Sequence, residues 1–128
     1  MDYRIRKLIA YLESNLHKLH SIEDMAQKVN LSVSHLQHLF KKETDITITQ
    51  HLRMKRIKKA HGLLTTSFLS VKEICVEIGM NDVSRFIKDF KTIYGITPTQ
   101  YRKSLYQKAA DNLEQLNARA KQESIPND

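Results

Sequence analysis

Cysteine, proline and glycine are scarce in this chain of 128 residues. It has one cysteine, Cys75, together with two prolines, three glycines and no tryptophan. A single cysteine forms neither an internal disulfide nor a cysteine-based zinc site, which is typical of a protein from a reducing compartment. We therefore expect a cytoplasmic protein whose fold depends on packing alone, with Cys75 as a small buried hydrophobic residue.

Long apolar runs and catalytic motifs are missing as well. No stretch approaches the roughly 18 apolar residues of a membrane span, and charges interrupt the apolar positions at the N-terminus, unlike a signal peptide. The sequence has no glycine-rich phosphate loop, no paired carboxylates in a plausible cleft and no nucleophile with its base. These observations predict no enzyme, no catalytic residue, no cofactor and no membrane partner.

Positive charge is in excess, and it is concentrated in the body of the chain. Twenty-one Lys and Arg against fourteen Asp and Glu give a net charge of +7. Residues 1–103 carry +8, whereas residues 104–128 carry −1. A basic body favours a polyanionic partner, and we expect nucleic acid in preference to an anionic membrane surface, the second candidate.

Apolar residues recur at three- and four-residue spacing almost throughout, which predicts an all-α fold. We expect a first helix over residues 2–17 and two further helices capped by Ser21 and Ser32. Thr47 and Gln50 form a capping box that opens a long helix through about Leu64. That helix is expected to act as a stiff linker.

The same order of elements then recurs. Ser21-Ile-Glu-Asp-Met matches Ser70-Val-Lys-Glu-Ile at an offset of 49, and from Ser32 onward the offset is 50. Each copy has a helix, a short turn and a polar second helix. Duplication alone builds a core, but two copies are too few for a solenoid, so the repeat favours a paired recognition device. We expect helix-turn-helix subdomains at 1–64 (with the linker helix) and 65–103, and a tail helix with a frayed end at 104–128.

The second helix of each copy has one apolar and one polar face. With 100° per residue, Leu36 and Phe40 lie on the inward face of the first copy, and Phe86 and Phe90 match them in the second. The alternative for the opposite faces is simple solvation, but side chains suited to DNA occur in both copies. They are Ser34, His35, Gln37, His38, Lys41 and Lys42 in the first, and Ser84, Arg85, Ile87, Lys88 and Lys91 in the second.

These side chains suggest individual roles in a major groove, which is about 12 Å wide and admits one helix. Arg85 and Lys88 would favour guanine and Gln37 adenine, while Ile87 would touch a thymine methyl. Phosphate contacts, which carry no sequence information, are expected for the lysines at the helix ends, Lys41, Lys42 and Lys91.

The linker adds five cations between residues 53 and 59. Arg56 lies close to the apolar side of the helix, so we expect it to bind a carbonyl group or an acidic side chain. The others are expected in solvent or near a nucleic-acid backbone; they are Arg53, Lys55, Lys58 and Lys59.

The sequence resembles the DNA-binding domain of the AraC/XylS family of bacterial transcription regulators. The residues that carry the resemblance span about residues 20–102. They include Leu31-Ser-Val-Ser-His-Leu-Gln-His-Leu-Phe-Lys-Lys-Glu-Thr, Ile74-Cys-Val-Glu-Ile-Gly-Met-Asn-Asp-Val-Ser-Arg-Phe and Phe90-Lys-Thr-Ile-Tyr-Gly-Ile-Thr-Pro-Thr-Gln-Tyr-Arg. The chain departs from residues usual in the family at His38, Asp45, His51 and Met80.

The resemblance implies a sequence-specific regulator of transcription, usually an activator that contacts RNA polymerase. It implies two recognition helices in adjacent major-groove segments of double-stranded DNA. Base recognition would fall on Ser34, Gln37 and His38 in the first copy and on Ser84, Arg85 and Lys88 in the second. The length resembles the small stand-alone members of the MarA and SoxS kind, although a fragment of a larger regulator would look the same.

Two further features suggest alternatives. His35 and His38 share one helical face, but no second motif completes a metal site, so we expect no metal. In the tail, Tyr106, Leu113 and Leu116 lie on a seam typical of a short coiled coil, together with Ala109 and Ala120. The seam raises the alternatives of a protein-interaction module, a nonspecific basic DNA-binding protein acting through its tail helix, or a dimer. A monomer, with the terminal helix packed on its own domain, is the simpler expectation.

Overall fold

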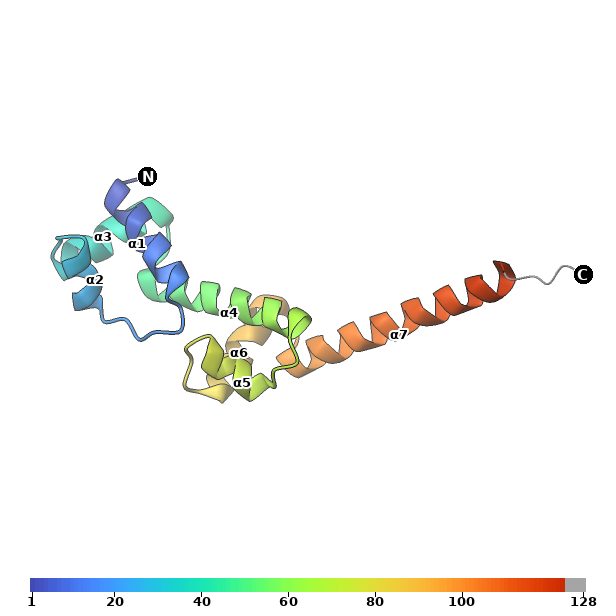
Figure 1. The fold of residues 1–128 in the computed structure, drawn as a ribbon. Helices are drawn as coiled ribbons and strands as arrows, with labels where there is room; N and C mark the ends of the chain where they lie inside the picture. Colours follow the sequence, from blue (N-terminus) through green and yellow to red (C-terminus); the bar gives the residue numbers. More distant parts are fainter. Residues whose placement is uncertain (124–128) are drawn as a thin grey trace, which may run out of the picture.

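Helix α4 (Ile48–Thr66) runs through the middle of the fold, with one group of helices on each half. The computed structural model describes residues 1–123, and all regular structure within them is helical. Helices α1 (Tyr3–Ser14), α2 (Ile22–Lys28) and α3 (Val33–Thr44) form the first group. Helices α5 (Val71–Glu77) and α6 (Val83–Tyr94) form the second, joined by the start of α7 (Pro98–Glu123). The prediction of an all-α fold with two helix-turn-helix units is confirmed (Figure 1).

The helices begin at the caps that the sequence predicts. The hydroxyls of Ser21 and Ser32 accept backbone N–H groups three residues on, at 3.0 and 3.1 Å. Thr47 and Ser70 each start a complete capping box, with Gln50 and Glu73 respectively. Only α1 is shorter than expected: it begins after its cap, Asp2, and ends at Ser14, where the predicted helix ran over residues 2–17.

Each helix-turn-helix unit has its own apolar core, and α4 contributes to both. Its first turns bury Ile48 and Leu52 among α1, α2 and α3, next to Leu36 and Phe40 of α3. Its later turns bury a second set among α5 and α6, made of Ile57, Ala60 and Leu64. Because one continuous helix has side chains in two cores, the two units cannot move independently without bending it.

One arginine in each unit holds a loop: the α1–α2 loop in the first unit and the α4–α5 loop in the second. In the first unit, Arg56 of α4 donates to the carbonyl oxygens of Leu16 and Lys18, at 3.0 and 3.1 Å. This confirms the expected carbonyl partner for Arg56. In the second unit, Arg102 of α7 donates to four carbonyl groups at the end of α4 and in the next loop, those of Leu63, Leu64, Ser67 and Leu69.

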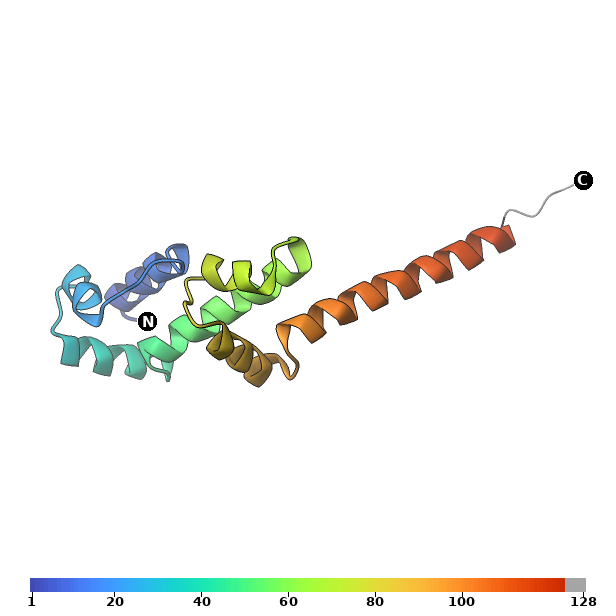
Figure 2. The same cartoon turned by 90° about the horizontal axis from the view of Figure 1, so that it is seen from below.

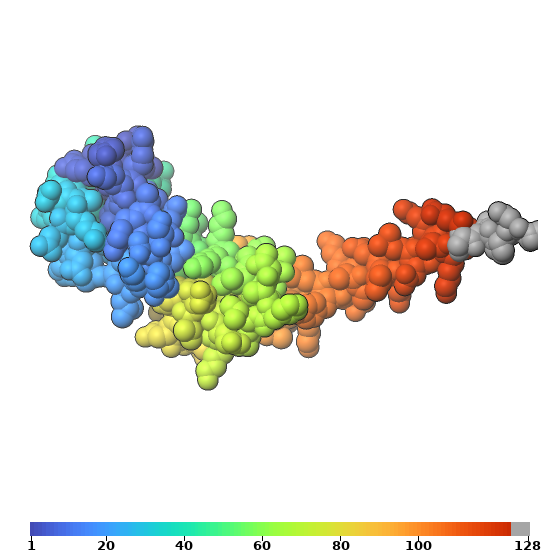
Figure 3. All heavy atoms as spheres, viewed as in Figure 1, coloured from blue at the N-terminus to red at the C-terminus, as the bar shows by residue number. Residues whose placement is uncertain are grey.

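The tail is not a separate helix, and it does not pack on the domain as expected. Thr97 and Gln100 cap α7 reciprocally, at 2.9 and 3.1 Å, so the helix begins inside the second repeat and continues across the predicted boundary at 103/104. Every described residue from Tyr106 onward is exposed, and α7 projects from the body as an arm (Figures 1 and 3). The expected packing was wrong: Tyr106, Leu113 and Leu116 of the seam are each more than half exposed. The frayed end expected at the C-terminus lies in residues 124–128, outside the described residues.

Within residues 1–123, none of the helices combines the length and the apolar character that crossing a membrane requires.

Removing residues 107–128 should leave the thermal midpoint of unfolding almost unchanged, because the described part of this segment lies outside both cores. Arg102→Ala is the contrasting variant. It should lower the free energy of unfolding by about 1–3 kcal/mol, since it leaves part-buried carbonyl groups without donors. Thermal denaturation followed by circular dichroism measures both effects.

Sedimentation of the intact and shortened chains should give monomers; a dimer that the truncation abolishes would instead establish the seam as an interface.

His51 of α4 should make the first unit sensitive to acid. Its side chain is 9% exposed, lies edge-on to Phe40, and has an Nε2 atom without a hydrogen-bond partner. Burial lowers the pKa of His51 first, Lys55 lowers it further, and Glu13 opposes the shift. Below the usual imidazole pKa of about 6.5 the unfolded chain therefore binds more protons than the native one, and stability falls as the pH decreases from there. In urea denaturation at several pH values, His51→Phe should flatten this dependence; an unchanged slope would contradict the assignment.

Candidate nucleic-acid interface

The polar face of α3 is formed as the sequence predicts. Leu36 and Phe40 are fully buried, and this fixes the rotation of the helix about its axis. The opposite side therefore points to solvent, and all six predicted residues on it are exposed: Ser34, His35, Gln37, His38, Lys41 and Lys42. Their accessibility is as predicted, whereas their contact with DNA remains a prediction.

Helix α6 repeats this construction. Asp82 caps it by accepting the backbone N–H of Arg85 at 3.1 Å, and Phe86 and Phe90 are fully buried. Four of the five predicted residues are exposed, namely Ser84, Arg85, Lys88 and Lys91. Ile87 is half-buried, so only part of its side chain is available to a thymine methyl.

Helices α3 and α6 lie on the same side of the molecule. In Figure 2 both follow the lower edge, with α4 crossing between them and α1, α2 and α5 on the other side. The polar face of each borders a hollow that it shares with α4. The hollow at α3 is about 790 Å³ and includes Gln37 and Lys41, and the hollow at α6 is about 770 Å³ and includes Arg85 and Lys88.

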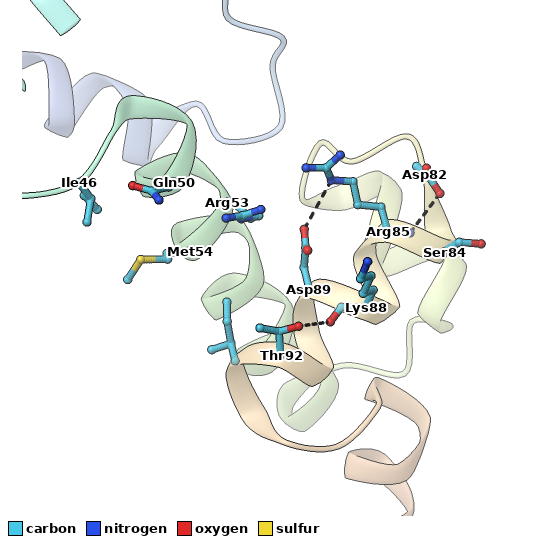
Figure 4. Close-up of a pocket in the computed structure, with 11 residues that line it drawn as sticks. Ile46, Gln50, Arg53, Met54, Asp82, Ser84, Arg85, Lys88, Asp89 and Thr92 are labelled. Carbon is cyan, nitrogen blue, oxygen red and sulfur yellow. Dashed lines mark hydrogen bonds and ion pairs between the residues drawn. The ribbon is translucent and has the colours of Figure 1, made fainter. Parts of the chain in front are cut away.

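Asp89 borders the second hollow and was not predicted from the sequence as part of this face. Asp89 lies one turn beyond Arg85, with its Oδ2 3.9 Å from the Arg85 Nε, and its side chain is only 13% exposed. Arg53 of α4 extends toward the same region (Figure 4). The i, i+4 spacing of Arg85 and Asp89 is a sequence pattern that would have revealed the pair. Asp89 is therefore a neighbouring carboxylate with which the exposed Arg85 guanidinium can pair.

The cations of α4 divide into structural and available groups. Arg56 is held by carbonyl groups, and Lys55 pairs with Glu13 of α1 at 3.0 Å. Lys58 and Lys59 are exposed, and Arg53 is half-buried at the hollow beside α6. These three remain candidates for the backbone of a nucleic acid.

Metal and thiol chemistry find no support among residues 1–123. No three His, Cys, Asp or Glu side chains in this part of the chain come together as metal ligands. Cys75 is 1% exposed in the second core, as predicted for a small buried hydrophobic residue. Burial, and to a lesser extent Asp82, raises the pKa of its thiol.

Comparison with known proteins identifies the family. A family model described as "Helix-turn-helix domain" matches residues 25–104. The chain is 32% identical over 100 residues to the HTH-type transcriptional activator AarP of Providencia stuartii, covering 78% of this chain and 74% of that protein. It is 36% identical over 84 residues to the Msm operon regulatory protein of Streptococcus mutans serotype c (strain ATCC 700610 / UA159), covering 66% of this chain but only 30% of that protein.

Among solved structures, the DNA-binding domain of AdpA, crystallised in complex with a target DNA, has the same fold. Its TM-score is 0.79 at 23% identity, and the match covers 84% of this chain and 96% of that one. The family model and the AarP match each cover most of both helix-turn-helix units. The chain belongs to the AraC/XylS family of helix-turn-helix transcription regulators.

Proposed function

We propose that this chain regulates transcription by binding double-stranded DNA with α3 and α6 in adjacent segments of the major groove. The observation that carries the proposal is the presence of two helices of the same construction on one side of the molecule, both in contact with the continuous helix α4. Each has a buried apolar face and an exposed polar one. A duplication that served only the core would not require both polar faces on the same side.

The dimensions of α4 support recognition of one duplex by both helices. Nineteen residues at 1.5 Å each make it about 28 Å long, comparable with the roughly 34 Å between successive major-groove segments. A monomer would then bind an asymmetric site of about 20 base pairs. A duplex that did not present both segments together would have to bend, at a cost of a few kcal/mol.

The proposed contacts divide into base recognition and phosphate binding. Gln37 would recognise adenine, and Arg85 and Lys88 guanine. In the absence of DNA, Asp89 would pair with Arg85, whose Nε lies 3.9 Å from the Asp89 Oδ2. A guanine, with its two acceptors, would then replace Asp89 as the partner of Arg85. Lys41, Lys42 and Lys91 would bind phosphates, and the smaller side chains Ser34, Ser84 and His38 would adjust the fit at neighbouring bases.

The regulatory function is favoured over the alternatives. AarP is named a transcriptional activator and the Msm protein an operon regulatory protein. Neither name supports a protein-interaction module or a nonspecific basic protein acting through its tail. We extend the proposal to a cytoplasmic, non-catalytic monomer, with RNA polymerase as the partner that the family implies. The exposed seam of α7 covers about two heptads, which is marginal for an independent dimer.

Selection of bound duplexes from a random pool at physiological salt tests the proposal. The expected consensus has two blocks about ten base pairs apart, because the two recognition helices would enter successive turns of one groove. Binding that disappears at moderate salt without yielding a consensus would instead establish a nonspecific polycation.

Single substitutions separate base recognition from phosphate binding. Gln37→Ala or Arg85→Ala should each cost about 1–3 kcal/mol on the selected site and relax the preference at one position. Lys41→Ala is the matched control, since it should weaken binding to all sequences alike and reduce the salt slope by about 1. Titration of the selected and a scrambled duplex measures all three. Equal losses on both duplexes for all variants would contradict the assigned roles.

A further inference from the structure

The turn between α5 and α6 touches the backbone of the first unit at Gly79. This glycine has φ of 82°, in the left-handed region. A Cβ built on it would lie 2.5 Å from the carbonyl oxygen of Leu16 and 2.9 Å from the Cα of His17. Both are backbone atoms of the α1–α2 loop, so no side-chain rotation would relieve the clash. The close approach therefore depends on a residue without a side chain.

The loop that Gly79 meets is fixed to the first core. The side chain of Leu16 is buried, and its carbonyl oxygen, the atom that faces Gly79, accepts a hydrogen bond from Arg56. Arg56 also binds the carbonyl of Lys18. The loop is further closed by a 2.8 Å contact between the His20 imidazole and the carbonyl of Asn15. A side chain at position 79 would have to move this whole loop or the turn itself.

The turn is fixed to the second unit in the same way. The N–H of Gly79 donates to Val76 and that of Met80 to Cys75, at 3.0 Å each. The buried thiol of Cys75 in turn donates to the carbonyl of Met80. Asp82, only three residues beyond Gly79, caps α6. A side chain at position 79 that pushed the turn away would consequently displace the start of α6, where Ser84 and Arg85 are located.

The first unit shows that a left-handed residue alone does not require glycine here. Asn30 occupies the matching position at the repeat offset of 49, with φ of 56°. It is exposed, and its side chain is accommodated. The requirement at position 79 therefore comes from the contact between the units and not from the turn.

We propose that the contact of Gly79 with Leu16 and His17 sets the relative position of the two recognition helices, and with it the spacing of bases that the protein accepts. Gly79 is thus a positioning residue that touches no DNA. This inference rests on the proposed function, because it concerns the spacing of the same two-block site.

Gly79→Asn tests the inference, with Gly95→Asn as the matched control. Gly95 has nearly the same φ, 85°, but a Cβ there meets nothing within 4 Å. Both variants are titrated with the selected site and with duplexes whose blocks are moved together or apart by one and two base pairs. Gly95→Asn should keep the wild-type optimum. Gly79→Asn should lose at least about tenfold on the wild-type spacing, as for one lost base contact, and should shift its optimum.

A site that keeps only the block recognised by α3 distinguishes misplacement from misfolding. A folded Gly79→Asn protein should bind it as wild type does. If Gly79→Asn does not fold, Arg56→Lys provides the second test: it loosens the loop, because a lysine cannot reproduce both hydrogen bonds, and it should flatten the dependence on spacing.

The outcomes separate this inference from the function. Identical spacing profiles for Gly79→Asn and Gly95→Asn, or an unaltered profile for Arg56→Lys, would overturn the role of the contact and leave the function standing. A wild-type protein that binds one block as tightly as two would overturn the proposed function itself.

Discussion

The sharing of α4 between two apolar cores is the constraint on which the rest of the structure depends. Ile48 and Leu52 belong to the first core, and Ile57 and Leu64 to the second. Neither core is complete without this helix, so its pitch and length determine how the second unit is rotated and displaced from the first. The polar faces of α3 and α6 therefore share one side of the molecule as a consequence of how each unit packs on α4.

The two units solve the same problem with different residues. Each has a loop before the helix-turn-helix, the α1–α2 loop or the α4–α5 loop, with carbonyl groups outside the regular helices, and each supplies a guanidinium to them. Arg56 does so in the first unit and Arg102 in the second, although the two positions do not match at the repeat offset. Arginine suits this task because its planar group directs several N–H donors in fixed directions. Both units therefore have an arginine that binds loop carbonyl groups, although the two arginines are not at equivalent positions of the repeat.

Local features of this fold could be predicted from the sequence, and contacts between distant segments could not. Capping by Ser21, Ser32 and Thr47 depends on residues within one turn, so it is visible in the sequence. The exposed faces of α3 and α6 follow from helical periodicity for the same reason. The direction of α7 and the approach of Gly79 to Leu16 depend on tertiary placement. Ile87 is intermediate: its place at the edge of the polar face was evident, but its half-burial depends on its neighbours in the fold.

The unequal surroundings of Asn30 and Gly79 mean that the duplicated halves have diverged in how much change they tolerate. The first turn accepts a polar side chain facing water, so drift at that site has few consequences for the fold. The second turn lies against the α1–α2 loop, and a Cβ at Gly79 would clash with the backbone of that loop. Exchange of one half for the other would therefore not restore the original molecule, because the two copies are no longer equivalent parts.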